Sequence, residues 1–253
     1  MIIDIHGHYF DAGLYPAWVP CGLTPLQNWA SHPDVSAIVT SSLDVFSKGV
    51  SENKILTIHC RTHPKLWQWL TIDPREPNWW VDLPTDRKIL GFKVHPTWQQ
   101  YELTDYLNNL LEVAKIKKWA ILTHSGVAEP YVDIKKSIEL ADRYPEVPVV
   151  FAHLGHGFSS YQDVMKQVDY LVKTKNENTL IDTSSLAIHL NGLLKETVKR
   201  IGSSRILFGT DMPLHFPESQ LSRVTMANLP AKEKEKILWK TAVSFWPKLK
   251  GRG

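Results

Sequence analysis

Two histidines near the start of the chain have the spacing of metal ligands. An apolar run ends in His6-Gly7-His8, which places the two histidines at positions i and i+2. Because side chains alternate between the faces of a strand, both imidazoles would project from one face at the strand's C-terminal end. Imidazole nitrogen is a common zinc ligand. Such a pair also arises by chance, so by itself it does not distinguish a metal site from an incidental repeat.

Further potential ligands end three later apolar runs. Residues 121–124, 149–153 and 206–211 contain runs that end in His124, His153 and Asp211. Chance seldom places potential zinc ligands at the same end of several separate strands. Catalytic zinc keeps one position open for water and lowers the pKa of that water to roughly 7. A carboxylate beside the water can take up its proton, so these residue types predict metal-assisted hydrolysis.

Strands and helices are predicted to alternate along the chain. Apolar runs and turn residues indicate strands over 2–8, 35–40, 66–72, 89–95, 121–124, 149–153, 178–183 and 206–210. Helical spacing of apolar residues indicates helices over 51–61, 103–117, 131–143, 161–172, 190–201, 218–226 and 232–245. Alternation implies a parallel sheet, and eight strands in 253 residues imply a closed barrel. We therefore predict an α/β protein with a single (β/α)8 TIM-type barrel over residues 1–253.

The predicted barrel gives the potential ligands a common location, because active sites of such barrels lie at the C-terminal ends of the strands. The residues that fall there are His6, His8, His95, His124, His153 and Asp211. A packed interior has little use for so many imidazoles, since each buried ring must find partners for two nitrogens. A metal ion satisfies several of them at once, which favours a metal site.

Composition and charge exclude several classes of partner. The formal net charge is +3 with basic and acidic residues interleaved, so we expect no nucleic-acid partner. The apolar runs are far shorter than the ~20 residues of a membrane helix, so we expect no membrane partner. Cys21 and Cys60 form neither a disulfide framework nor a C-x-x-C pair, which indicates a reducing compartment. With no signal-like start, the chain is expected to be cytoplasmic and to bind a small-molecule substrate; homo-oligomer formation stays open.

Six stretches of the chain together resemble one enzyme superfamily. They are Asp4-x-His6-x-His8, Gly91-Phe92-Lys93-Val94-His95-Pro96, Leu122-Thr123-His124-Ser125-Gly126, Phe151-Ala152-His153-Leu154-Gly155, Ile181-Asp182-Thr183-Ser184 and Leu207-Phe208-Gly209-Thr210-Asp211-Met212-Pro213. In this order, over nearly the whole chain, they are similar to the amidohydrolase superfamily. The branch they resemble holds both metal-dependent hydrolases and non-oxidative decarboxylases.

The resemblance implies a role for each potential ligand. His6 and His8 would be metal ligands from the first strand, and His124 would be the ligand from the fifth. Asp211 would bind the metal and handle protons, and His153 would be a second-metal ligand or a catalytic histidine. The cofactor would be zinc (Zn2+), as one ion rather than two, although other divalent metals fit the same donors. Two structural roles stay open, since His153 could be a buried core residue and Asp211 a helix cap.

Three residues near the fourth strand are candidates for contact with the substrate. Lys93 and His95 share a strand face, and Trp98 follows in a loop. Some members of the superfamily carry a carboxylated lysine here that bridges two metals; an unmodified Lys93 could instead bind a substrate carboxylate or pair with Asp4 or Asp211. The resemblance to mononuclear members favours the unmodified lysine. His95 could equally be a hydrogen-bonded structural residue. Asp4 is expected to orient a metal ligand or to form a salt bridge.

The sequence therefore predicts a metal-dependent, amidohydrolase-type hydrolase of a small ester, lactone or amide. Asp211, helped by His153, would take the proton of the activated water. The alternative is a non-oxidative metal-dependent decarboxylase of a small carboxylic acid, because the two classes share these ligands. An inactive metal-binding protein and a metal-dependent nuclease are weaker alternatives, since the ligand set is intact and no basic stripe is evident. No role is assigned to His156.

Overall fold

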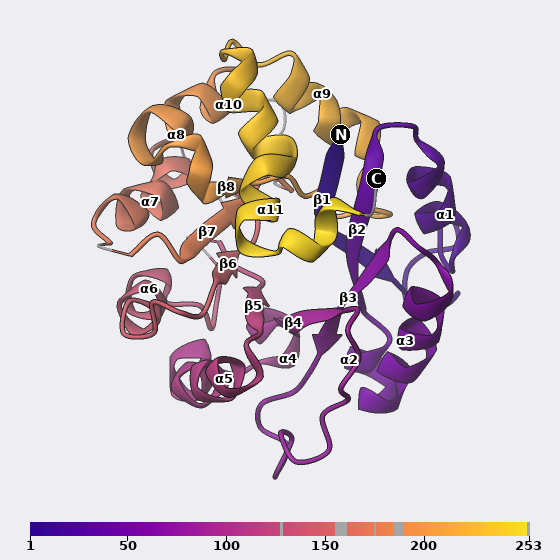
Figure 1. Cartoon of the computed structure of the whole chain (residues 1–253). Coiled ribbons are helices and arrows are strands. Elements are labelled where there is room, and N and C mark those ends of the chain that lie inside the picture. Colours follow the sequence, from indigo (N-terminus) through magenta and orange to yellow (C-terminus); the bar gives the residue numbers. More distant parts are fainter. Residues whose placement is uncertain (127–128, 155–160, 175, 185–189, 252–253) are drawn as a thin grey trace.

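Eight parallel strands form the centre of the molecule (Figure 1). The computed structural model describes residues 1–126, 129–154, 161–174, 176–184 and 190–251. The strands are β1 (Ile2–Tyr9), β2 (Val35–Ser42), β3 (Leu66–Thr71), β4 (Ile89–Val94), β5 (Ala120–Thr123), β6 (Val149–Phe151), β7 (Thr179–Asp182) and β8 (Ile206–Leu207). They lie side by side in chain order, and each hydrogen-bonded pair is parallel. This arrangement confirms the predicted (β/α)8 TIM-type barrel.

Helices surround the strands on the outside (Figure 1). The α-helices are α1 (Thr24–Ser31), α2 (Val45–Lys48), α3 (Asn53–Thr62), α4 (Pro96–Gln99), α5 (Leu103–Lys117), α6 (Ile134–Ala141), α7 (Tyr161–Val172), α8 (Leu193–Ile201), α9 (Pro217–Thr225), α10 (Ala231–Glu235) and α11 (Thr241–Phe245). The predicted bounds are right for α5 and α7. The single helix predicted over 232–245 is α10 and α11 joined by a π-helical turn, η4 (Lys236–Lys240). The sequence pattern does not predict α1, α2 and α4. The last two have only four residues each, too few to show a helical period of apolar residues.

Hydrogen bonds between the segment after β8 and β1 close the barrel. The amide of Ile5 donates to the carbonyl of Phe208 at 2.9 Å, and the amide of Asp211 donates to the carbonyl of His6 at 2.7 Å. The regular part of β8 ends at Leu207, earlier than the predicted end at 210. Two residues further on, at Gly209, a Cβ atom would lie only 2.9 Å from the Cβ of His6, so this segment approaches β1 closely.

Two apolar layers hold the strands in place. Inside the barrel, alternate strand residues such as Ile3, Leu122 and Leu180 pack against one another. Outside it, residues of the opposite strand faces pack against the helices, as Phe92 and Leu107 do. The indole of Trp69 inside the barrel donates to the carbonyl of Ile5 at 2.7 Å. These layers leave the carboxyl ends of the strands as the place where polar side chains gather.

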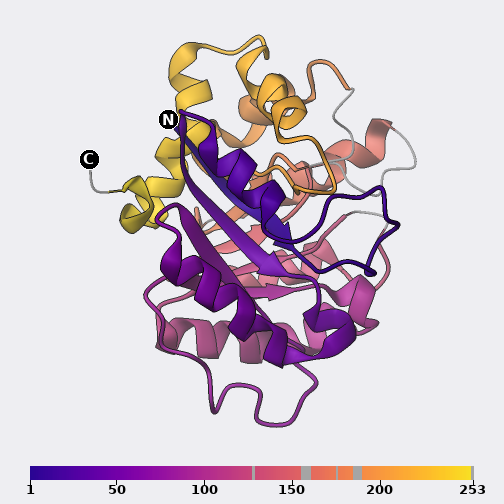
Figure 2. The same cartoon turned by 90° about the vertical axis from the view of Figure 1, so that its right-hand side faces the viewer.

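The two ends of the barrel have different roles. In Figure 2 the arrowheads of the strands point to one end, and the N-terminus and α11 lie at the opposite end. Trp246, which follows α11, packs on Trp69 with ring centroids 5.8 Å apart and covers the amino end of the barrel.

Within the described residues, no helix combines the length and the apolar composition that crossing a bilayer requires.

Candidate metal centre

His6 and His8 meet Asp211 at the carboxyl ends of β1 and β8. The ligand atoms of these three residues lie within 4.8 Å of one another, and all three residues are buried. His8 Nε2 lies 2.8 Å from Asp211 Oδ1, and His6 Nε2 lies 3.7 Å from the same oxygen. Two imidazole nitrogens and a carboxylate oxygen therefore face a common point, in the way that the ligands of a zinc ion do.

A register shift in β1 turns the histidines into the barrel. Between Asp4 and Gly7, β1 has one residue more than the facing part of β2. An extra residue of this kind reverses the alternation of side chains between the two faces. Asp4 consequently accepts a hydrogen bond from the indole of Trp29 on α1, at 3.0 Å, while the histidines that follow point inward. Such shifts are common next to active sites because they re-aim a side chain.

Asp4 joins β1 to β8 and does not orient an imidazole. Its carboxylate accepts hydrogen bonds from the hydroxyl of Thr210 at 2.6 Å and from the amide of Thr210 at 3.1 Å. It also accepts the main-chain amide of His6 at 3.1 Å. Burial raises the pKa of Asp4 to about 7, against the effect of these hydrogen bonds. Asp4 thus positions the backbone of a ligand rather than its ring, and within the described residues it forms no salt bridge within 4.0 Å.

Both β1 histidines have their second ring nitrogen occupied. His6 Nδ1 lies 2.8 Å from Asp182 Oδ2, and His8 Nδ1 lies 2.9 Å from the hydroxyl oxygen of Ser41. Ser41 is the residue directly opposite His8 in the β1–β2 register. Partners of this kind fix the ring and leave Nε2 for the metal, so the two imidazoles are already oriented toward the common point.

The charge states of these groups suit a divalent cation. Burial lowers the pKa of His8 to about 4, so its imidazole is neutral at pH 7 and can donate a lone pair. Burial alone would raise the pKa of Asp211, but hydrogen bonds with His215 and His8 hold its pKa well below the usual range. Neutral imidazole and ionised carboxylate are the metal-binding forms of these groups. The donor set therefore fits zinc or a related ion.

The remaining strand-end histidines form a second group beside the first. His153 Nε2 lies 3.1 Å from His124 Nδ1, and the ring of His95 stacks on that of His124 with centroids 3.8 Å apart. The ring of His153 lies 5.0 Å from that of His6. Burial lowers the pKa of both His95 and His153 well below the usual value. His124 lies next to His153, outside the group of three ligand atoms that converge, and its role as a ligand stays a prediction.

Lys93 reaches the centre from β4. Its side chain is 1% exposed, and its Nζ lies 3.3 Å from His6 Nε2. Burial lowers the pKa of Lys93 to about 8, against the fields of Asp211 and Asp182. Within the described residues Lys93 has no ion pair within 4.0 Å, so the pairing expected with Asp4 or Asp211 is not formed. A buried cation without a carboxylate partner is a candidate contact for an anionic group of a ligand.

A comparison with protein families identifies the family of this chain. The family model described as amidohydrolase matches residues 3–248, nearly the whole chain. The chain belongs to the amidohydrolase family. No curated protein is similar enough in sequence to this amidohydrolase to count as a match.

Solved structures with the same fold include both hydrolases and decarboxylases. One is a probable 2-pyrone-4,6-dicarboxylic acid hydrolase from Acinetobacter baumannii with citric acid bound (15% identity, TM-score 0.69, covering 97% of this chain and 99% of that chain). Another is 2,6-dihydroxybenzoate decarboxylase from Rhizobium (15% identity, TM-score 0.70, covering 99% of this chain and 100% of that chain). A third is an amidohydrolase from Burkholderia multivorans with bound zinc (15% identity, TM-score 0.71, covering 98% of this chain and 99% of that chain). At these identities the likeness shows a shared fold and leaves the reaction open.

In this amidohydrolase, aromatic side chains stand beside His95. Trp98 lies in the short helix α4, not in the loop that the sequence predicted, because Pro96 starts a helical turn. His95 Nδ1 accepts the main-chain amide of Trp98 at 3.2 Å and so caps this helix, which leaves its other ring nitrogen for a ligand. Trp98 is 38% exposed, and its ring centroid lies 5.2 Å from that of Phe46. Trp98 and Phe46 form the wall between His95 and the outside of the barrel.

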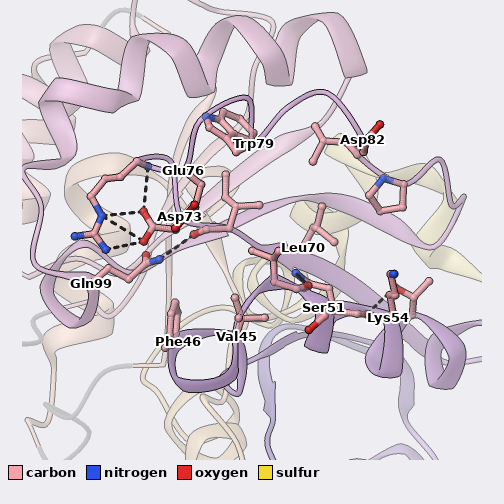
Figure 3. Close-up of a pocket in the computed structure, with 18 of the residues that line it drawn as sticks. Val45, Phe46, Ser51, Lys54, Leu70, Asp73, Glu76, Trp79, Asp82 and Gln99 are labelled. Atoms are coloured by element: carbon pink, nitrogen blue, oxygen red, sulfur yellow. Dashed lines mark hydrogen bonds and ion pairs between the residues drawn. The ribbon is translucent and has the colours of Figure 1, made fainter.

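A groove of about 1190 Å³ lies beyond that wall (Figure 3). It runs between α3 and the segment 72–88, which connects β3 to β4 without a helix. In Figure 3, Trp79 and Asp82 stand on one side and Ser51 and Lys54 on the other. None of the candidate metal ligands lines this groove, so the groove is a hollow separate from the metal centre.

Four residues of the site had no role in the sequence prediction: Ser41, Asp182, Ser184 and His215. Asp182 could have been found, because it ends a predicted strand as the other acidic and histidine candidates do. His215 Nε2 lies 3.4 Å from Asp211 Oδ2. The partners of His8 and His153 depend on which residues of neighbouring strands lie opposite each other, which a single sequence does not show. His156 lies outside the described residues.

Proposed function

We propose that this amidohydrolase is a hydrolase that cleaves a small ester, lactone or amide with one divalent metal ion, zinc in the first place. The convergence of His6 Nε2, His8 Nε2 and the ionised Asp211 Oδ1 carries this proposal. His124 is the proposed additional ligand. A cytoplasmic enzyme with a small-molecule substrate and no nucleic-acid or membrane partner remains part of the proposal.

The metal ion, when bound, polarises a carbonyl oxygen and lowers the pKa of a water molecule. Asp211 is placed to move the proton. Its Oδ1 faces His8, and its Oδ2 lies 3.4 Å from His215 Nε2, whose side chain is 22% exposed. Because its low pKa keeps it ionised, Asp211 can accept a proton at the centre and pass it outward through His215.

His153 and Lys93 supply the other groups that hydrolysis needs. His153 is buried and neutral, so its imidazole can first accept a proton and then pass that proton to a leaving group. Lys93 Nζ, 3.3 Å from His6 Nε2, can hold negative charge that develops on the substrate's oxygen. His95 and Trp98 are proposed to contact the rest of the substrate.

A decarboxylase is the second candidate, and one observation favours it. Lys93 is a buried cation without a carboxylate partner among the described residues, and the carboxylate of an acidic substrate would provide one. A carboxylate held there would also lie beside the proposed metal ligands. The fold likeness to 2,6-dihydroxybenzoate decarboxylase agrees with this alternative without deciding it.

Oxygen-18 water distinguishes the two reactions. The zinc-loaded protein would be incubated with a panel of lactones, esters, amides and carboxylated aromatic acids, and the products examined by mass spectrometry. Hydrolysis places one oxygen atom of the solvent in the product. Decarboxylation releases carbon dioxide and takes up a solvent hydrogen on carbon. We expect labelled oxygen in the product of an ester, lactone or amide.

The matched control is the double variant His6→Ala/His8→Ala, which retains the rest of the barrel. Turnover that survives in this variant would come from a contaminant or from a site without metal. Turnover of carboxylated acids alone, with gas release and no labelled product, would replace the hydrolase with the decarboxylase.

A further inference from the structure

One carboxylate on β7 contacts two histidines from two other strands. Asp182 is fully buried. Its Oδ2 lies 2.8 Å from Nδ1 of His6 on β1. Its Oδ1 accepts the main-chain amides of His153, which follows β6, and of Ser184, each at 3.0 Å. The hydroxyl of Ser184 also donates to Oδ1 in a short hydrogen bond. Both oxygens of Asp182 are therefore engaged, each toward a different part of the site.

These bonds decide which nitrogen of His6 carries the hydrogen. An ionised carboxylate only accepts hydrogen bonds, so the hydrogen of a neutral His6 must be on Nδ1, the atom that faces Asp182. Nε2 is then left with its lone pair on the side of Lys93, His8 and Asp211.

The hydroxyl of Ser184 also indicates that His6 carries its hydrogen on Nδ1. Its oxygen lies 3.0 Å from His6 Nδ1 and 3.0 Å from His153 Nδ1. Because its one hydrogen goes to Asp182, it can only accept from the two rings. The carbonyl of Ser184, 3.2 Å from His153 Nδ1, can also only accept. Both imidazoles therefore carry their hydrogen on Nδ1 and present Nε2 to the site.

Asp182 also holds an unusual backbone conformation. His153 has a φ of 64°, in the left-handed region that histidine seldom adopts. The hydrogen bond from the main-chain amide of His153 to Asp182 is one of the contacts that keep His153 in this conformation. Backbone strain of this kind persists only where surrounding contacts over-determine it, and it concentrates at functional sites.

We propose that Asp182 is the positioning residue of this centre: it sets the Nδ1–H tautomer of His6 for metal binding and holds the backbone of His153 at the same time. The inference concerns the metal centre of the proposed function, but it is tested on metal affinity and on the rings themselves. A protein that binds zinc through this arrangement and hydrolyses nothing would overturn the proposed reaction and leave this inference in place.

The test is Asp182→Asn, which keeps the shape and removes one acceptor. If the new amide group faces His6, it donates to Nδ1 and moves the ring hydrogen to Nε2, the nitrogen that should bind metal. If the amide group faces the other way, it opposes the amides of His153 and Ser184. We expect zinc affinity, measured by competition with a chromophoric chelator, to fall by about 10- to 100-fold, as for loss of other partners of ligand histidines.

Ring-nitrogen NMR spectra of the metal-free protein provide the second readout. In the wild type, the His6 resonances, assigned from their loss in His6→Ala, should show the hydrogen on Nδ1. In Asp182→Asn with the amide group facing His6, that hydrogen should be on Nε2. The matched control is Asp4→Asn. Asp4 is equally buried at the same end of the barrel, but its carboxylate accepts from amides, an indole and a hydroxyl.

Asp4→Asn should lower stability and leave the His6 tautomer unchanged, because the carboxylate of Asp4 touches no imidazole ring. A wild-type spectrum with the hydrogen of His6 on Nε2 would overturn the inference without any variant, so the test does not depend on the folding of Asp182→Asn. Equal zinc affinity in the wild type and Asp182→Asn would also overturn it, as would the same change of tautomer in Asp4→Asn.

Discussion

Two single residues at this site adopt backbone conformations that amino acids other than glycine usually avoid. Asp211 has a φ of 58° and His153 a φ of 64°. Asp211 turns its carboxylate toward His8 and His215, at 2.8 and 3.4 Å, and its main-chain carbonyl accepts the amide of Leu214. The contacts of the carboxylate with imidazoles favour a chemical role over the helix cap that the sequence left open.

Asp211→Asn should therefore remove activity with little change in fold. Asparagine tolerates the left-handed conformation as well as aspartate does, so the backbone is retained. The turnover number should fall by about 10²-fold or more, as for loss of a general base, with a smaller loss of bound metal. Because the pKa of Asp211 lies well below 3.8, its protonation should reduce wild-type activity only at pH values below that. Steady-state rates, a pH profile and metal analysis measure these effects.

Asp133→Asn is the control for the structural reading. Asp133 caps α6 by accepting the amide of Lys136, and asparagine caps helices equally well. This variant should keep both activity and stability. If Asp211→Asn behaves in the same way, with a near wild-type turnover number, Asp211 has no part in proton transfer and His153 becomes the candidate base.

At the scale of elements, the sequence predicts those strands and helices whose bounds follow from the local pattern of apolar residues. The strand carrying His6 and His8 and the bounds of α5 and α7 follow from runs and periods of apolar residues. The inward direction of the histidines depends on the register shift between Asp4 and Gly7, which needs the pairing with β2. Asp182 and Ser41 are partners of histidines from other strands, so their roles depend on sheet register rather than on their own sequence context.

The close approach of β1 to the segment after β8 is a further property of elements. A Cβ atom at Gly209 would lie 2.9 Å from the Cβ of His6 and 3.2 Å from Cγ of Asp182. Gly209→Ala should therefore push the two segments apart at a proposed ligand. We expect a loss of about 1–3 kcal/mol in the free energy of unfolding, typical of overpacking, together with weaker zinc binding. Urea titration and chelator competition measure the two effects.

Gly7→Ala is the matched control on the facing strand. The atom nearest to its Cβ would lie at 3.4 Å, compared with 2.9 Å at Gly209, so the cost should be smaller. Equal stability and zinc affinity in Gly209→Ala and the wild type would show that the segments can separate without cost. The close approach would then be incidental to the site.

For the whole molecule, the barrel separates folding from chemistry. The apolar layers fill the interior and cover the amino end, whereas the polar groups gather at the carboxyl ends of the strands. Three of the proposed metal ligands, His6, His8 and Asp211, come from the first strand and from the segment after the last one, where hydrogen bonds close the barrel. A metal held there would join the two ends of the sheet, so its effect should extend to the stability of the entire fold.

Zinc should accordingly raise the melting temperature of the metal-free wild type. An ion that binds only the folded state at a hundredfold excess over Kd adds about 2.7 kcal/mol, which corresponds to about 5–10 °C for a chain of this size. His6→Ala/His8→Ala should melt close to the metal-free wild type, because the ligands lie at the rim, and zinc should leave the melting temperature of this variant unchanged.

The control His32→Ala/His63→Ala removes two histidines away from the centre and should retain the full zinc response. Calorimetry with and without zinc, combined with metal analysis, decides the matter, and an equal response in all three proteins would remove His6 and His8 from the metal site.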